Sequence, residues 1–219
     1  MSAHPELAFL HTAQFHVETF SDLLEQLAPE VAAKHVVRED LLFFAKEMGP
    51  DHPEVVERTR SAMHRAAESG ARVVVCTCST LGAAAEGTEG GGRFTAMRID
   101  RAMADSAAAS GGPVLLVATL ESTLEPTKAL LRSSAARANR PVDIDSVLAA
   151  AAWPHFVAGR ISEYYAAIAQ AVRACLPHPR VIVFAQSSMH GAVPLLADCA
   201  IPVLTSPALG VQADVAALG

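Results

Sequence analysis

The chain has 219 residues, of which 51% are hydrophobic and 18% are charged, and its formal net charge is −6. This balance predicts a folded globular protein and gives no basis for a nucleic-acid partner. The four cysteines lack the spacing of a disulfide scaffold, the first residues lack the basic segment of a signal peptide, and no apolar run reaches the ~18 residues of a membrane helix. We therefore expect a cytoplasmic protein that contacts neither nucleic acid nor membrane.

The first part of the chain alternates predicted strands and helices. A buried strand that ends at His11-Thr12 comes first, and an amphipathic helix, a short strand, a helix capped by Asp51 and closed by Gly70, and a third strand follow. Their ranges are 7–10, 17–27, 35–37, 51–70 and 73–76. This order predicts a parallel α/β arrangement, because parallel neighbours need crossover helices.

The third strand continues directly into Cys78 and the segment Ser79-Thr80. Side chains alternate along a strand, so Cys76 and Cys78 share a face and Cys78 lies nearer the open end. Unpaired N–H groups and the helix dipole at the following helix start favour a thiolate. Cys78 is therefore the candidate reactive residue, and the alternative is that both cysteines are small buried packing residues.

Residues 86–93 are rich in glycine and interrupt the pattern. They do not form a dinucleotide fingerprint, because no strand leads into G-x-G-x-x-G spacing. The segment is either a flexible connector or a mobile flap over the site after Cys78. Arg98, which follows it, is expected at a charged helix start, with pairing to a substrate carboxylate as the alternative.

The second part of the chain repeats the pattern. A buried strand ends at Thr119, Ser122 or Thr123 caps the next helix, a long helix opens at Trp153-Pro154, and a last helix starts at Ser206. The predicted strands are 114–118, 142–144, 181–184 and 201–204. The third of these runs into Gln186-Ser187-Ser188, about half the chain length after Cys78-Ser79-Thr80.

This repetition predicts two similar parallel α/β halves, related by a pseudo-twofold axis, with the active site in the cleft between them. The expected first half is 1–94 plus 204–219 and carries Cys78, and the expected second half is 95–203 and carries Gln186-Ser187-Ser188. Ligands of open α/β sheets bind outside the carboxyl ends of the strands.

The sequence resembles the aspartate/glutamate racemase superfamily, which includes amino-acid and hydantoin racemases, arylmalonate decarboxylase and maleate isomerase. The resemblance rests on four motifs in order: Cys78-Ser79-Thr80, Ala118-Thr119 with Ser122-Thr123, residues 182–188, and residues 201–206. It implies a racemase or isomerase that needs no cofactor and holds a small carboxylate substrate, such as an amino acid or a diacid. The oligomeric state stays open, with a homo-oligomer as one alternative.

One position departs from this family. Its two-base racemases carry a cysteine in each half, and here Gln186, which is neither acid nor base, stands at the second position. A racemase would then need His11, our second catalytic candidate, or His190 to carry the other proton. The alternative is one-thiol chemistry, as in a stereoselective decarboxylase or a cis-trans isomerase.

Removal of a proton beside a carboxylate builds negative charge, which hydroxyls and backbone N–H groups stabilise. The candidate substrate-binding residues, all at expected strand ends or helix starts, are Thr12, Ser79, Thr80, Thr119, Ser122, Thr123, Gln186, Ser187 and Ser188. For the hydroxyl residues the alternative role is helix capping. The histidines and cysteines show no metal-binding spacing. A cysteine hydrolase and a weakly catalytic ligand-binding protein remain as other functional classes.

Overall fold

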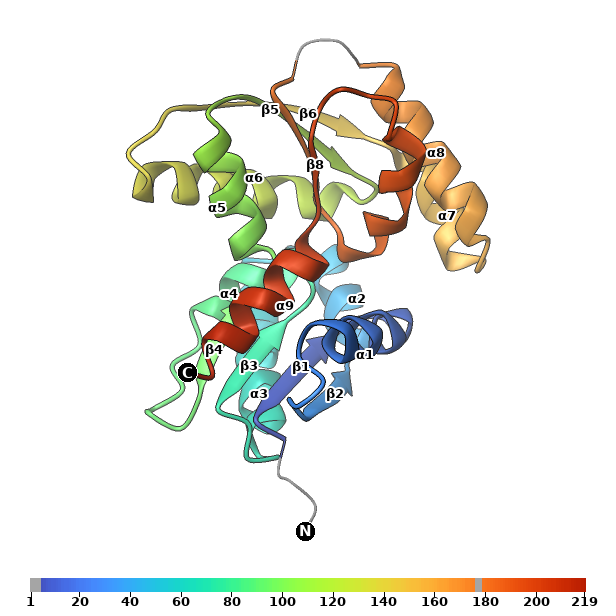
Figure 1. Cartoon of the computed structure of the whole chain (residues 1–219). Helices are drawn as coiled ribbons and strands as arrows, with labels where there is room; N and C mark the ends of the chain where they lie inside the picture. The colour runs from blue at the N-terminus through green and yellow to red at the C-terminus, as the bar shows by residue number, and fades with distance from the viewer. Residues whose placement is uncertain (1–4, 176–178) are drawn as a thin grey trace. The chain divides into compact units, whose positions relative to one another are not determined.

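The computed structural model describes residues 5–175 and 179–219. The first residues, on which the signal-peptide expectation rests, lie outside this part. The chain forms two compact units: unit 1 comprises Met1–Ala102 and Pro207–Gly219, and unit 2 comprises Met103–Ser206. Each unit contains its own sheet, as the ribbon in Figure 1 shows.

Unit 1 is built on a parallel sheet of four strands in the order β2-β1-β3-β4. The strands are β1 (Leu7–His11), β2 (Ala33–Val37), β3 (Val73–Cys76) and β4 (Thr95–Arg98). β1 and β3 are central and their residues are buried, as the runs Leu7–Leu10 and Val73–Val75 predict for strands covered on both faces.

Helices cover both faces of this sheet. One face packs in a hydrophobic cluster that includes Leu10 and Val74, with Leu41 and Val55 from neighbouring helices. The other face packs Phe9 and Val75 against Phe20 and Val211. The helical elements of unit 1 are α1 (Phe15–Leu27), α2 (Glu39–Met48), α3 (Pro53–Ala67), the 3₁₀ turn η1 (Ser79–Leu81), α4 (Gly82–Glu86) and most of α9 (Ser206–Ala216).

Unit 2 repeats this plan with a parallel sheet in the order β6-β5-β7-β8. Its strands are β5 (Gly112–Ala118), β6 (Val142–Leu148), β7 (Val181–Phe184) and β8 (Val203–Leu204). Its helical elements are most of α5 (Arg101–Ser110), α6 (Glu121–Arg137), η2 (Ala150–Ala152), α7 (Trp153–Val157), α8 (Ile161–Arg173) and η3 (Ser187–Leu196). Tyr164, Ile168 and Val172 of α8 fill the core on one side.

The predicted fold class is confirmed: the chain is an α/β protein with two parallel halves. The two sheets have the same strand order, in which the first strand of each unit is central and the fourth is at an edge. β1 therefore corresponds to β5, and β3 corresponds to β7. This equivalence is what makes the strand ends of the two units comparable residue by residue.

Several local predictions are wrong in detail. His52, not Asp51, caps α3, since its ring accepts the Glu54 N–H. Leu120 precedes α6, so Ser122 and Thr123 lie inside the first turn and do not cap it. The long helix expected from Trp153 is divided into α7 and α8 at Gly159, which has a φ of +70° that favours glycine.

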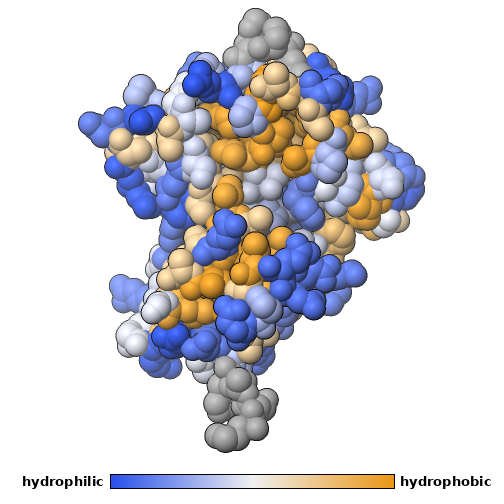
Figure 2. Space-filling view, in the orientation of Figure 1, coloured by the Kyte–Doolittle hydropathy of each residue, from blue (hydrophilic) through white to orange (hydrophobic). Residues whose placement is uncertain are grey.

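The structure also contains elements that the sequence pattern did not indicate. Strand β4 runs over Thr95–Arg98, so Arg98 ends a strand and the helix start expected there lies at Arg101, where α5 begins; α2 was not predicted. Helix α9 begins at Ser206 as expected, and Figure 2 shows hydrophobic side chains gathered over it on the visible face of unit 1. Among the described residues, no helix is long and apolar enough to cross a membrane.

Candidate functional site

The carboxyl ends of β1 and β3 bring Thr12 and Cys78 together in unit 1. Leu10 pairs with Cys76 in the sheet register, and the Thr77 N–H donates to the Leu10 carbonyl at 3.0 Å, which extends the ladder beyond the strand end. Continuing this register places Thr12 beside Cys78. Side-chain alternation directs both toward the same face of the sheet.

Four donors surround the Cys78 thiol: the Thr12 hydroxyl, the N–H groups of Thr80 and Leu81, and the Thr80 hydroxyl, and each lowers the pKa of Cys78. Burial acts in the opposite direction and is the larger effect, so the pKa of the thiol is raised overall. The N–H groups at the helix start favour the thiolate as expected, but burial outweighs them. These donors stabilise the thiolate when it forms, and the residue retains 9% exposure.

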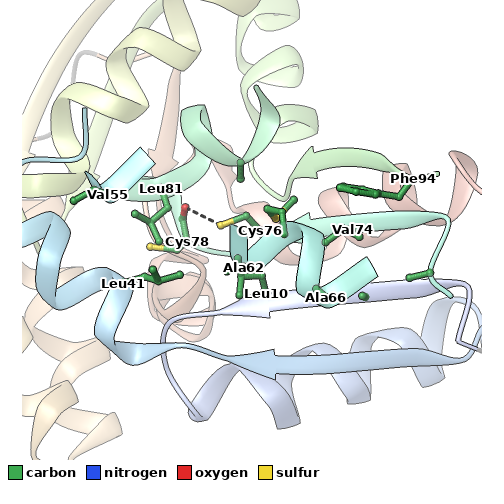
Figure 3. Close-up of a cluster of buried hydrophobic side chains, with 14 of the residues drawn as sticks. Leu10, Leu41, Val55, Ala62, Ala66, Val74, Cys76, Cys78, Leu81 and Phe94 are labelled. Carbon is green, nitrogen blue, oxygen red and sulfur yellow. Dashed lines mark hydrogen bonds between the residues drawn. The ribbon is translucent and has the colours of Figure 1, made fainter. Parts of the chain in front are cut away.

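The apolar surroundings of Cys78 explain the effect of burial. Figure 3 shows Leu41, Val55 and Leu81 around Cys78 at the end of the sheet. Cys76 lies deeper in the same cluster, on the same face as predicted, and its thiol donates to the Cys78 carbonyl at 3.7 Å. Burial raises the pKa of Cys76 strongly, which makes it a packing residue.

Arg98 is committed to an internal ion pair. Its guanidinium donates to both oxygens of Asp100, at 2.6 and 3.0 Å, and both side chains are buried. It also donates to the Ser79 carbonyl at 3.4 Å, which ties the turn after Cys78 to β4. The alternative in which Arg98 binds a substrate carboxylate is therefore not supported.

His11 lies in the core with no exposed surface. Its Nδ1 is 2.8 Å from the Thr77 hydroxyl, and its Nε2 is 2.8 Å from Nδ1 of His35. Burial, and then the neighbouring His16 and His35, lower the pKa of His11 to about 2. A neutral ring with both nitrogens engaged is a poor proton carrier, so we do not retain His11 as a catalytic acid.

In unit 2 the corresponding strand ends bring Thr119 and Gln186 together. The Gln186 carbonyl oxygen accepts the Thr119 N–H at 2.7 Å, and its amide nitrogen donates to the Thr119 hydroxyl at 2.8 Å. Val117 pairs with Phe184, so Thr119 and Gln186 are related by the same register as Thr12 and Cys78. Gln186 therefore occupies the place of the thiol and orients Thr119.

Tyr164 is a polar member of this network that the sequence did not indicate. Its hydroxyl is 2.8 Å from Ser188 Oγ and 3.4 Å from Thr119 Oγ1, and burial raises the pKa of the phenol to about 12. The only available signal was that a buried tyrosine needs a hydrogen-bond partner for its hydroxyl.

The remaining hydroxyl candidates of unit 2 are Ser187, Thr123 and Ser122. Ser187 Oγ is 3.1 Å from Ser206 Oγ, and Thr123 is buried in the first turn of α6. The Ser122 hydroxyl is buried and has no hydrogen-bond partner within residues 5–175 and 179–219. Ser122 is thus a hydroxyl left available at the start of α6, where Leu120 provides no side-chain cap.

His190 lies in η3, one turn after Gln186. Its Nδ1 is 3.0 Å from the Ser187 carbonyl, which acts as acceptor and fixes the proton on Nδ1. Nε2 is then the nitrogen that can exchange a proton. Elsewhere, the described part of the chain contains no group of three or more His, Cys, Asp or Glu side chains that could hold a metal ion.

Three solved structures show what this fold is similar to. The aspartate racemase of Picrophilus torridus is 12% identical, with 99% of this chain and 93% of that chain covered and a TM-score of 0.69. Allantoin racemase from Klebsiella pneumoniae is 17% identical, with coverage of 97% and 86% and a TM-score of 0.60. A variant of arylmalonate decarboxylase is 16% identical, with coverage of 98% and 94% and a TM-score of 0.62. The chain has the fold of these enzymes.

No protein-family model matches the chain, and no curated protein matches it. At such low identities the structural likeness establishes the fold and not the activity. It confirms the predicted resemblance for the arrangement of strands and helices over nearly the whole chain. The chemistry has to be argued from the residues at the strand ends.

Proposed function

We propose that the chain is a cofactor-independent enzyme of the racemase or isomerase type, which acts on a small carboxylate through Cys78. The observation that carries this proposal is the set of donors around the Cys78 thiol, from Thr12, Thr80 and Leu81. Donors that lower the pKa of a buried thiol against the effect of burial are typical of a cysteine that has to exist as a thiolate. The fold, shared with racemases, is consistent with this role.

The proposed reaction is transfer of the proton on the carbon next to the carboxylate. The thiolate of Cys78 takes the proton, an S–H bond forms as the C–H bond breaks, and the electron pair moves onto the carboxylate oxygens. Hydroxyls and helix N–H groups stabilise that charge as it develops. Ser79, Thr80, Thr119, Ser122, Thr123, Ser187 and Ser188 are the proposed carboxylate-binding residues.

A racemase also needs an acid for the opposite face of the carbon. Gln186 cannot supply it, since an amide neither gives nor takes a proton at ordinary pH and both of its ends are bonded to Thr119. We assign this role to Nε2 of His190, whose ring is oriented by the Ser187 carbonyl. Gln186 is then a positioning residue for Thr119.

Exchange of the α-proton in D₂O, followed by NMR over a panel of small amino acids and diacids, tests the proposal. We expect both enantiomers of the true substrate to exchange and to invert. Cys78→Ala should abolish exchange from the enantiomer whose proton the thiolate removes, His190→Gln should abolish exchange from the other enantiomer, and neither variant should invert the substrate. The rate should rise with pH as the raised pKa of Cys78 is approached. Unchanged exchange in Cys78→Ala would refute the role of the thiol.

One observation favours a decarboxylase as a second candidate. The raised pKa of Cys78 keeps the resting thiol protonated, as a proton donor requires. Loss of carbon dioxide from a malonate-type diacid would leave a carbanion, to which Cys78 would add its proton on one face only. Release of carbon dioxide with formation of a single enantiomer, in the absence of any α-proton exchange, would select this function over racemisation.

A further inference from the structure

His11 and Thr77 lie one register step before the pair that forms the thiol site. Leu10 pairs with Cys76, so the next positions along β1 and β3 are His11 with Thr77 and then Thr12 with Cys78. Alternation places the first pair on the face with Phe9 and the second on the face with Leu10. The 2.8 Å contact between His11 Nδ1 and the Thr77 hydroxyl therefore joins the two chain segments directly before Thr12 and Cys78.

A second histidine fixes the orientation of the first. The Ser21 hydroxyl donates to the Val17 carbonyl at 2.7 Å, so its oxygen is available to accept from His35 Nε2 at 3.3 Å. His35 Nδ1 is 2.8 Å from His11 Nε2, and His11 Nδ1 is 2.8 Å from the Thr77 hydroxyl, which also donates to the Leu10 carbonyl at 3.3 Å. The rings of His11 and His35 are stacked at 5.1 Å.

The rings of His11 and His35 are neutral, which allows this chain of hydrogen bonds. Burial lowers the pKa of both His11 and His35, and the neighbouring His16 and His35 lower the pKa of His11 further. Each neutral imidazole has one donor and one acceptor nitrogen, so each ring can give one hydrogen bond and receive another in the chain from Ser21 to Thr77. The pair thus holds Thr77 in one rotamer.

In unit 2 the positions equivalent to His11 and Thr77 precede Thr119 and Gln186, and no thiol follows them. The residues that correspond to His11 and Thr77 are Ala118 and Ala185, which carry no polar side chain. There, Gln186 and Thr119 are joined directly by two hydrogen bonds. A thiol forms only weak hydrogen bonds, so Cys78 cannot hold Thr12 in this way.

We propose that His11 and His35 form a histidine clamp that positions Thr12 against the Cys78 thiol, acting through Thr77. The inference rests on the proposed role of Cys78. The clamp does not touch the substrate; it keeps the ends of β1 and β3 in register, so that the Thr12 hydroxyl remains within hydrogen-bond reach of the sulfur. Loss of the clamp removes a donor that stabilises the thiolate.

The test is the pH profile of Cys78 alkylation by iodoacetamide in the full chain, with each cysteine quantified by peptide mass spectrometry. His35→Phe keeps the aromatic contact with Phe9, whose ring lies 5.3 Å from that of His35, and removes the partner of His11. We expect the profile to move to higher pH and the rate at pH 8 to fall about fivefold, since the thiolate fraction follows the pKa. His35→Gln, which keeps an acceptor, should restore most of the rate.

His64→Phe is the matched control, because His64 is a partly buried histidine of α3 whose ring contacts Phe94. It should lower the alkylation rate by less than twofold. Thr77→Val removes the hydroxyl that His11 contacts and should move the pH profile of Cys78 alkylation in the same direction. This variant tests the clamp independently if His35→Phe does not fold.

An unshifted profile in His35→Phe or Thr77→Val, or faster alkylation through a loosened site, would overturn the clamp. This measurement uses no substrate. A shifted profile in a chain that exchanges no α-proton would retain the clamp and reject the proposed function.

Discussion

At the residue scale, the chemistry of this chain depends on how a few buried polar side chains are satisfied. Cys78 is buried among aliphatic side chains, yet it has four donors from three residues. His11 has a partner at each ring nitrogen and is neutral. Asp214 of α9 is the contrasting case: it is fully buried, and neither carboxylate oxygen has a hydrogen-bond partner within the described residues.

The buried carboxyl of Asp214 leads to a prediction of how the free energy of unfolding depends on pH. Burial raises the pKa of this carboxyl well above its usual value, so the folded protein holds the proton more tightly than the unfolded chain does. Its contribution to the free energy of unfolding is undiminished at pH values below ~4 and falls by about 1.4 kcal/mol per pH unit above that, until the pKa of the folded state is reached.

Asp214→Asn should therefore become more stable relative to the parent as the pH rises from 4 to 7. Urea unfolding at several pH values measures this difference. Asp51→Asn removes the same charge from an exposed position and should show no such trend. A constant difference between parent and Asp214→Asn across this range would show that Asp214 is not protonated in the folded state.

At the element scale, the turn from β3 into α4 is the critical connection. It carries Ser79 and Thr80 directly after Cys78, and Arg98 of the neighbouring strand β4 donates to the Ser79 carbonyl. Gly82 starts α4 against the same guanidinium, because a Cβ at this position would lie 2.5 Å from Arg98 Cζ. The ion pair between Arg98 and Asp100 leaves that side chain little freedom to move.

Gly82→Ala should consequently disturb the thiol site as well as the fold. The added methyl group displaces a paired, buried guanidinium, and we expect a loss of about 1–3 kcal/mol in the free energy of unfolding. Ala83→Ser adds one atom at the next, exposed position and serves as the control. Urea unfolding measures the loss, and equal stability of the two variants would mean that Arg98 relaxes without cost.

At the scale of the whole molecule, the chain uses one topology twice for two different purposes. Both units have the same strand order, and the ends of the first and third strands hold Thr12 with Cys78 in unit 1 and Thr119 with Gln186 in unit 2. Only the first pair contains a group that can exchange a proton. The equivalence predicts that a thiol at Gln186 would be placed like Cys78.

Gln186→Cys should therefore rescue a chain that lacks His190. In the double variant Gln186→Cys with His190→Gln, we expect the α-proton exchange in D₂O to be accompanied again by inversion. Thr119 is at hand to stabilise the new thiolate, as Thr12 does for Cys78. Gln186→Ser with His190→Gln is the control and should not invert the substrate. Failure of the cysteine variant to invert, with exchange by Cys78 intact, would argue against the second-face assignment.

The sequence by itself determined the fold class and the repeat. Runs such as Val73–Val75 and Val181–Phe184 indicate buried parallel strands on hydrophobicity alone, and polar residues after each strand mark the strand ends where we propose the site. These signals are local, so one chain segment is enough to read them. Strand β4 escaped prediction because Thr95–Arg98 has neither an apolar run nor clean alternation, and its pairing with β3 decides its conformation.

Only the tertiary structure decided what each polar side chain does, because burial and hydrogen-bond partners depend on residues far apart in the sequence. It placed His11 between Thr77 and His35, paired Arg98 with Asp100, joined Gln186 to Thr119, and added Tyr164 to that network. It also reversed the expected shift of the Cys78 pKa, since the packing of α2 and α3 around the strand end outweighs the nearby donors. A residue type shows which chemistry is possible, and its surroundings select the chemistry that is used.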